Sequence, residues 1–165
     1  LACEFLKNKG YNLSLDLIGV KNKKFEKTEL FTKIKKINSK HKDLIKFSKL
    51  KNHKNIKKIL KNYDLHVYPS TCESFGIIIL ETIASSLPII SSNYPVFREI
   101  LKKNSIYFNP YNHLDISKKI LMYMNNRKIR KKNTIKLFRL SKNYKWNLTC
   151  DKTYLAIKDQ YKKNI

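Results

Sequence analysis

Short apolar segments of β-type composition alternate with lysine-rich helical segments from residue 14 to residue 110. This alternation is typical of a parallel sheet that helices cover, because each crossover between parallel strands needs a helix. It predicts strands at residues 14–20, 43–47, 64–70, 88–92 and 105–110. It predicts helices near residues 1–10, 26–39, 53–63, 76–86 and 95–101, and a helical tail from residue 113 that is interrupted near residues 143–146. The expected fold class is therefore α/β, with a Rossmann-like parallel sheet flanked by helices.

The chain of 165 residues has the size of one domain, and it is strongly basic, with a formal net charge of +24. Such a charge is compatible with binding to nucleic acid or to an anionic membrane. However, nearly all the cations are lysines spread along the whole chain, whereas proteins that recognise phosphate groups often favour the forked guanidinium of arginine. The arginines are Arg98, Arg127, Arg130 and Arg139. We therefore expect no nucleic-acid partner, and keep a basic non-catalytic module that binds nucleic acid or acidic membrane as an alternative.

The cysteines and histidines form no recognisable metal or disulfide pattern. Cys3, Cys72 and Cys150 are odd in number and far apart, which favours a reducing compartment such as the cytoplasm. No signal peptide is visible, and no apolar run approaches the roughly 20 residues that span a bilayer. The chain opens at Leu1 with a segment that reads as a helix closed by Gly10, so we expect a fragment truncated at its N-terminus.

The most apolar segment, YPSTCESFGIIILETIASSLPIISSN at residues 68–93, contains two glutamates. Its apolar residues Ile77, Leu80 and Leu87 fall at helical spacing, and the almost uniform apolarity predicts a helix that is buried all round. Glu73 precedes this helix and Glu81 lies within it. A carboxylate in an apolar helix costs several kcal/mol unless it is paired, so Glu81 needs a ligand or an internal partner. A buried lysine or a backbone amide is the alternative to a ligand.

Glu73 lies in a loop that follows a strand, and ligands of open parallel sheets bind at the carboxyl ends of strands. The loop also carries the unpaired backbone N–H groups at the start of the helix, and the helix dipole adds about half a positive charge there. These N–H groups belong to Ser74, Phe75, Gly76 and Ile77. The site would suit a ligand with hydroxyl and phosphate groups. Alternatively, Glu73 only caps the helix, for about 1 kcal/mol.

The segment PSTCESFGIIILETIASSLPIISSN resembles the signature of the retaining glycosyltransferases of family 4, roughly P-S-x-x-E-x-F-G-hydrophobic-x-x-x-E-A-x-A-x-G-x-P-V-I. SLDLIGV resembles the family's L-x-I-x-G strand, NYDLHVYPS the lead into the motif, and KWNLTCDKTYLAIKDQYKKNI the terminal helix. The resemblance implies the C-terminal half of a two-domain GT-B enzyme. Residues 1–145 would form the Rossmann-like domain that binds the nucleotide-sugar. Residues 146–165 would form a helix that packs toward the N-terminal domain.

The resemblance also implies an activity, the transfer of a sugar from a nucleotide-diphosphate sugar to a glycan or lipid-linked acceptor. Glu81 would hold the ribose hydroxyls, and Glu73 would contact the sugar near its anomeric carbon. The amides of Phe75, Gly76 and Ile77 would approach the sugar and the diphosphate. The remaining donor contacts would come from Ser74, from Gly19 at the end of the first strand, and from a base site near Ser48, Lys49 and Leu50. The motif implies no metal and no other cofactor.

Several positions depart from the family pattern. The basic pair that neutralises the diphosphate precedes the first helix and is absent, so we expect the isolated chain to be inactive. Ser86, Thr82 and Ser48 replace small residues that the family usually has as glycine, alanine and glycine. Lys21, Lys23 and Lys24 follow the first strand and either supply charge near the phosphates or form a solvated loop.

Two further expectations concern partners. A nucleotide-sugar epimerase of related architecture is an alternative enzyme, although the F-G and alanine-rich parts of the motif disfavour it. Acidic residues at the helix entrance would repel a polyanion, which disfavours the nucleic-acid alternative. We expect a cytoplasmic protein with a possible peripheral contact to the inner face of an anionic membrane through residues 126–136, the alternative being a solvated helix face.

Overall fold

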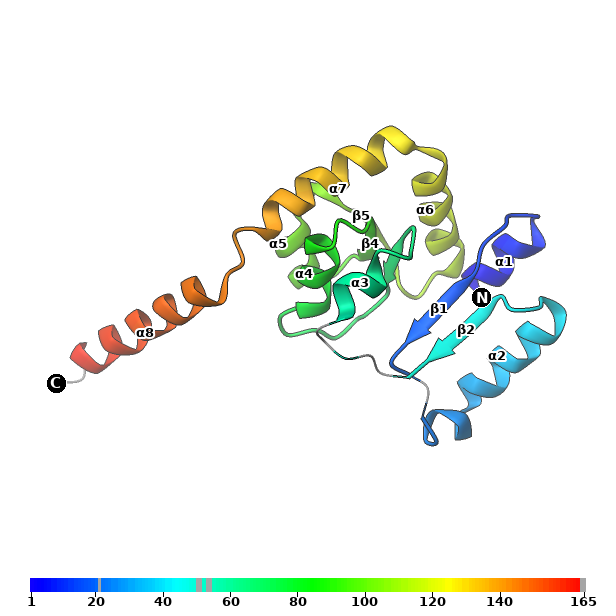
Figure 1. Ribbon diagram of the computed structural model, residues 1–165, viewed down its shortest axis with the longest axis horizontal. Coiled ribbons are helices and arrows are strands. Elements are labelled where there is room, and N and C mark those ends of the chain that lie inside the picture. The colour runs from blue at the N-terminus through cyan, green and yellow to red at the C-terminus, as the bar shows by residue number, and fades with distance from the viewer. Residues whose placement is uncertain (21, 50–51, 53–54, 164–165) are drawn as a thin grey trace.

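The computed structural model describes residues 1–20, 22–49, 52 and 55–163, which form a parallel α/β fold (Figure 1). The strands are β1 (Leu15–Ile18), β2 (Ile45–Ser48), β3 (His66–Tyr68), β4 (Ile89–Ser92) and β5 (Ile106–Phe108). The helices are α1 (Ala2–Asn8), α2 (Glu29–Lys40), α3 (Ile56–Leu60), α4 (Ile77–Ala84), α5 (Pro95–Leu101), α6 (His113–Asn125), α7 (Arg127–Ser141) and α8 (Trp146–Lys163). Short 3-10 turns occur at Phe25–Lys27 and Lys102–Asn104. The predicted order of strands and helices is confirmed up to β5, as is the break between α7 and α8. The helical tail has a second break that was not predicted, at Asn126 between α6 and α7, where the Asn126 side chain caps α7 by accepting from the N–H of Ile129.

The strands form two parallel ladders rather than one sheet. β1 pairs with β2, with Leu15 opposite Ile45, while β4 lies between β3 and β5. Within the described part of the chain, no ladder joins β1 to β3. The two parts are linked by the Tyr63 hydroxyl, just before β3, which donates a hydrogen bond to the Asp16 carboxylate on β1.

Helices cover both faces of the three-stranded sheet because successive residues of a strand point to opposite faces. Ile89 of β4 packs with α4, α5 and α7, whereas its neighbour Ile90 packs with α1 and α6. A third cluster joins α2 to the β1–β2 ladder through Ile34 and Ile45. Every residue of β4 is buried, as expected for a central strand with helices on both sides.

Helix α4 is buried on one face only, which corrects the prediction that it is buried all round. Ile79, Thr82 and Ile83, at positions i, i+3 and i+4, are buried. Ile77 and Ile78, however, are 47% and 50% exposed. The helix lies against the sheet along a single stripe, so the residues of its first turn that point away from the stripe reach the surface despite their apolar character.

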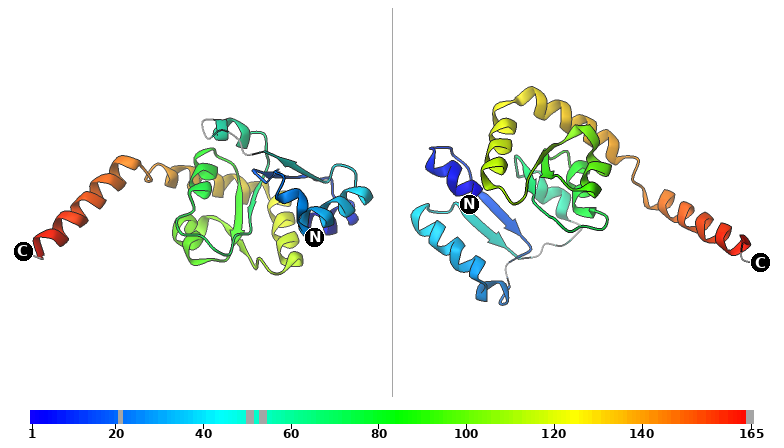
Figure 2. Two further views of the ribbon diagram at one scale, coloured as in Figure 1. Left: turned by 90° about the horizontal axis from the view of Figure 1, so that it is seen from below. Right: turned by 180° about the vertical axis from the view of Figure 1, so that it is seen from behind.

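Helix α8 projects from the rest of the molecule in both figures that show the whole chain (Figure 1 and Figure 2). Residues 146–162 are all exposed. Trp146, Tyr154, Ile157 and Tyr161 recur at helical spacing along one side of it. Among the helices described, none is long and apolar enough to cross a membrane.

Candidate functional site

The end of strand β3 orients the first motif glutamate, Glu73. The hydroxyl of Tyr68, the last residue of β3, donates a hydrogen bond of 2.6 Å to Oε2 of Glu73. The backbone N–H of Ser74 donates to Oε1 at 3.2 Å. The Tyr68 hydrogen bond lowers the pKa of Glu73, and the amides of Gly76, Ser74 and Phe75 lower it further. Glu73 is therefore a carboxylate at neutral pH, held in one orientation by the strand and by its own loop.

Glu73 was expected either to contact a ligand or only to cap the helix, and its contacts are compatible with both roles. Its carboxylate faces the loop amides that were expected to be unpaired, so Glu73 stabilises the loop that leads into α4. The residue is also only partly buried, so part of it stays accessible to solvent. A ligand hydroxyl could thus donate to a carboxylate that the protein has already oriented.

Gly76 has a packing role in addition to the ligand role expected from the sequence. It is the N-cap of α4 and has a φ angle of +78°, in the left-handed region that favours glycine. A Cβ atom at this position would lie 3.2 Å from Cδ1 of Ile100 on α5. The loop therefore passes so close to α5 that a side chain would disturb it.

Glu81 lies four residues after Ile77, about 6 Å along the axis of α4. The residue is partly buried, and its Oε1 atom is shielded from solvent. The next two residues, Thr82 and Ile83, belong to the buried stripe. The structure thus places Glu73 at the entrance of the helix and Glu81 one turn inside it.

The predicted base site lies at the ends of the other ladder. The N–H of Gly19 donates to the carbonyl of Ser48 at 3.1 Å, and Gly19 has a φ angle of +88°. Leu50 and Lys21 lie outside the described residues, while Lys23, Lys24 and Lys49 are exposed. Both predicted groups follow carboxyl ends of strands, the Gly19–Ser48 pair after β1 and β2 and the Glu73 loop after β3.

A cavity of about 520 Å³ at the carboxyl ends of β3, β4 and β5 was not predicted from the sequence. Ser70 and Thr71 of the motif form part of its lining, but Glu73 and Glu81 do not. Its other lining residues are Ser92, Asn93, Tyr94, Arg98, Tyr107, Phe108, Asn109, Pro110, Tyr111 and Asp115. Hydroxyls, amides and aromatic rings dominate this set, which suits a neutral polyhydroxylated ligand in a cavity of ligand size.

Two contacts hold one wall of this cavity. The Arg98 guanidinium lies 4.4 Å from the centroid of the Tyr107 ring and donates to Oδ1 of Asn93. The Ser92 hydroxyl donates to the carbonyl of Ser70, which joins the end of β4 to the loop after β3. Polar residues directly after each strand are the signal by which the sequence could have indicated the cavity.

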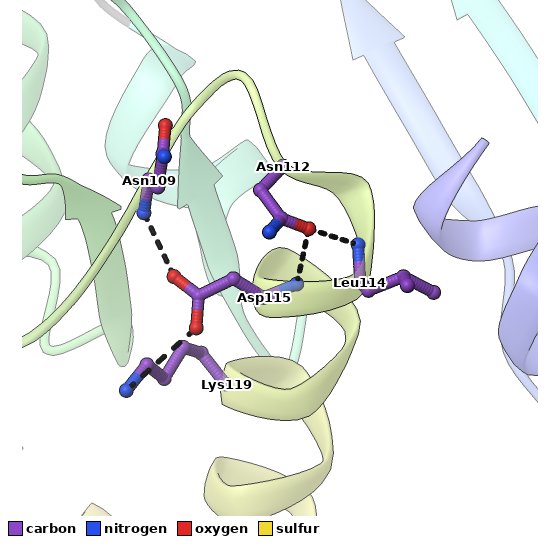
Figure 3. Close-up of polar contacts among 5 residues, drawn as sticks. All are labelled: Asn109, Asn112, Leu114, Asp115 and Lys119. Carbon is purple, nitrogen blue, oxygen red and sulfur yellow. Dashed lines mark hydrogen bonds and ion pairs between the residues drawn. The ribbon is translucent and has the colours of Figure 1, made fainter.

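The other wall is the loop between β5 and α6 (Figure 3). Asn112 caps α6 because its Oδ1 accepts from the N–H groups of Leu114 at 3.0 Å and Asp115 at 3.1 Å. The Asp115 carboxylate accepts from the N–H of Asn109 at 2.8 Å and lies 3.9 Å from Nζ of Lys119. These contacts fix the loop and leave one carboxylate in the cavity lining.

The partly buried His66 on β3 contacts the motif helix α4. Nδ1 of His66 lies 2.7 Å from Oγ1 of Thr82, and that hydroxyl donates to the carbonyl of Ile78 at 2.8 Å. Since the hydroxyl proton is used, Nδ1 of His66 carries the proton of their shared hydrogen bond. Burial lowers the pKa of His66 to about 4, so the imidazole is neutral at physiological pH. We infer that it positions α4 on β3 and takes no part in chemistry.

Metal-binding groups and thiol pairs are absent from the part of the chain that the structure describes. No three His, Cys, Asp or Glu side chains lie together there in a way that could hold a metal ion. Cys3, Cys72 and Cys150 are free, and the last two are exposed. Burial raises the pKa of the Cys3 thiol. Cys72 directly precedes Glu73 in the chain.

Comparisons with known proteins agree on one group of enzymes. The family model described as Glycosyl transferases group 1 matches residues 1–136. The GtfA subunit of the UDP-N-acetylglucosamine–peptide N-acetylglucosaminyltransferase of Streptococcus parasanguinis is 36% identical over 83 residues, which are 50% of this chain and 15% of that protein. The chain therefore spans well under two thirds of this relative's length.

Solved structures show the same fold. HepE of Anabaena, in complex with UDP and glucose, has a TM-score of 0.79 at 13% identity, over 96% of this chain and 44% of that one. The catalytic domain of the cholesterol-alpha-glucosyltransferase from Helicobacter pylori has a TM-score of 0.67 at 26% identity, over 87% of this chain and 86% of that one. The Rossmann-like α/β fold predicted from the sequence is thus confirmed.

Proposed function

The chain belongs to the glycosyl transferases of group 1, and we propose that it binds the donor in a retaining transfer of a sugar from a nucleotide-diphosphate sugar to a glycan or lipid-linked acceptor. The name of GtfA refers to a UDP-sugar, and HepE has been solved with UDP and glucose. These relatives support a nucleoside diphosphate as the common part of the donor. They leave the sugar of this protein open, since its choice depends on loop contacts.

The observation that carries the proposal is the oriented Glu73 carboxylate at the entrance of α4, with Glu81 one turn further along. In the proposed complex, Glu81 accepts hydrogen bonds from the ribose hydroxyls and Glu73 accepts them from the transferred sugar. Hydrogen bonds to charged groups contribute roughly 1.5 to 3 kcal/mol each. The Ile77 amide and the α4 dipole face the diphosphate, where negative charge grows as the sugar leaves, and the Phe75 and Gly76 amides are shared between the diphosphate and the Glu73 carboxylate.

We further propose that the chain is the donor-binding half of a GT-B enzyme of family 4, with residues 1–145 as the nucleotide-sugar domain. Helix α8 then packs on a second domain that carries most of the acceptor site. Its exposed side chains Trp146, Tyr154, Ile157 and Tyr161 support this role, because a row of exposed aromatic and aliphatic side chains is usually covered in a functional assembly. The proposed enzyme works in the cytoplasm, needs no metal, and does not turn over as this chain alone.

Isothermal titration of the folded chain with UDP and other nucleoside diphosphates tests the donor site. We expect Glu81→Ala to weaken binding by about tenfold or more, which corresponds to one lost charge-assisted hydrogen bond or two. Glu99→Ala, which removes an exposed carboxylate from α5, is the matched control and should bind as the wild type does.

Two results would overturn the donor-site proposal. One is the failure of every nucleoside diphosphate to bind both this chain and a longer version that includes the second domain. The other is binding that depends steeply on salt and is unaffected by Glu81→Ala, which would indicate a basic module that attracts polyanions.

A further inference from the structure

A second cavity, of about 350 Å³, lies at the opposite end of the sheet from the proposed donor site. Its lining residues are Pro88, Arg127, Arg130, Lys131, Thr134 and Ile135. Pro88 directly precedes β4, so the cavity is at the amino end of that strand, whereas the Glu73 loop follows the carboxyl end of β3. A ligand here would not compete with a donor there.

The cavity is lined by three cations and no carboxylate. Arg127, Arg130 and Lys131 occupy positions i, i+3 and i+4 of α7, so they share one face of its first turns, where the helix dipole adds positive charge. Among the described residues, no carboxylate forms an ion pair with any of the three. An N–H group of Arg130 donates to the carbonyls of Tyr123 and Met124 at 3.3 and 3.4 Å, which anchors this side chain at the end of α6.

Thr134 supplies an independent indication of a ligand. It lies seven residues after Arg127 on the same helix face and lines the cavity. Its Oγ1 atom is buried and has no hydrogen-bond partner among the described residues. A helical threonine usually donates to a carbonyl of the preceding turn, and a buried hydroxyl without a partner costs about 1 to 3 kcal/mol. Because Oγ1 is shielded from solvent in the observed conformation, an anion oxygen in the cavity could accept from this hydroxyl after the threonine side chain rotates about its Cα–Cβ bond.

We propose that this cavity binds a phosphate group, with Arg127 and Lys131 as the main charge partners and the Thr134 hydroxyl as a neutral donor. The phosphate belongs either to a soluble phosphate compound or to the headgroup of an anionic lipid. Ile135 and Met124, which are 42% and 37% exposed, lie beside the cations. Apolar side chains next to clustered cations are what a protein presents to an anionic membrane surface.

NMR titration of the amide groups tests the soluble source, with inorganic phosphate and pyrophosphate as probes. We expect the shifts to concentrate at residues 127–135. Arg127→Gln/Lys131→Gln should weaken binding by about tenfold or more. The matched control, Lys132→Gln/Lys136→Gln, removes the same charge from exposed residues of α7 outside the cavity and should change binding less than about twofold.

Co-sedimentation with phosphatidylglycerol vesicles, against phosphatidylcholine vesicles, tests the lipid source with the same variants. Binding of the vesicles alone assigns a lipid headgroup, and binding of soluble phosphate alone assigns a soluble compound. Thr134→Val keeps the charge and shape and should weaken the observed binding several-fold. Circular dichroism and urea unfolding establish that each variant is folded.

An equal loss of binding affinity in both double variants would show general attraction to a basic surface and would overturn the proposed phosphate site. The absence of binding to every probe would overturn it as well. The UDP titration separates this inference from the donor-site proposal. Arg127→Gln/Lys131→Gln should bind UDP as the wild type does, because its substitutions lie at the other end of the sheet.

Discussion

At the scale of single residues, Gly76 combines a backbone constraint with a packing constraint. Gly76→Ala places a Cβ at φ +78° and 3.2 Å from Ile100, whereas Gly10→Ala meets φ +86° with nothing within 4 Å. The left-handed backbone costs alanine about 1 to 2 kcal/mol in both variants. We expect Gly76→Ala to lose about 1 kcal/mol more than Gly10→Ala in the free energy of unfolding, because Ile100 must also shift.

Urea unfolding of the two glycine variants measures this difference. Equal losses would mean that the loop before α4 relaxes away from α5 without cost. The comparison therefore separates close packing from backbone strain at the entrance of the proposed donor site.

His66 makes stability depend on pH between its unfolded and folded pKa values. The unfolded pKa is about 6.5, and burial lowers the folded pKa to about 4. Below pH 6.5 the unfolded state binds a proton that the folded state does not, so stability falls as the pH falls. Each pH unit within this window costs up to about 1.4 kcal/mol, so we expect a loss of about 2 kcal/mol between about pH 7.5 and about pH 5.

Urea unfolding across this pH range, on the wild type and on His66→Gln, checks the prediction. The variant should be less stable at neutral pH and should show a flatter profile, because it has no imidazole to titrate. An unchanged slope in the variant would assign the pH dependence to another group.

At the scale of elements, the burial of α4 differs from the burial that its sequence pattern predicts. Ile83 is 1% exposed and packs in the core, whereas Ile78 is 50% exposed. We expect Ile83→Ala to lower the free energy of unfolding by about 2 to 5 kcal/mol, through lost burial and a cavity. Ile78→Ala should cost less than about 1 kcal/mol in the isolated chain. Thermal unfolding of both variants measures the contrast.

A large loss for Ile78→Ala would show that α4 is covered on a second face in solution. Sequence periodicity could not settle this point, because consecutive isoleucines give every face of the helix the same hydrophobicity. The order of the other elements up to β5 was predictable, because each has a local period and end signals such as Gly10 and Pro95. Their lengths were less so, since strand β1 and helix α3 are shorter than predicted.

At the scale of the whole molecule, α8 stands apart from the folded body (Figure 2). Since residues 146–162 are exposed, we expect removal of residues 146–165 to change the free energy of unfolding of the remainder by less than about 0.5 kcal/mol. Urea unfolding of the shortened and the complete chain checks this. A larger loss would show that α8 folds back onto the body in solution.

Some features of the candidate site follow from the sequence, and others appear only in the folded molecule. The motif placed Glu73 and Glu81 around one helix, and the structure agrees with that placement. The sequence held no sign that Tyr68 would donate to Glu73, because a strand end and a loop meet only after the chain turns. The cavity bounded by Arg98 and Tyr107 needs three loops that follow three different strands.

The sequence by itself determined the α/β alternation, the family and the position of the motif, because these are local patterns of residue type and spacing. Only the tertiary structure decided which face of α4 is covered, and that Pro88 lies beside Arg127 and Thr134. Such contacts join segments far apart in the chain. Their geometry follows from how helices pack on the sheet, and local residue spacing carries no information about it.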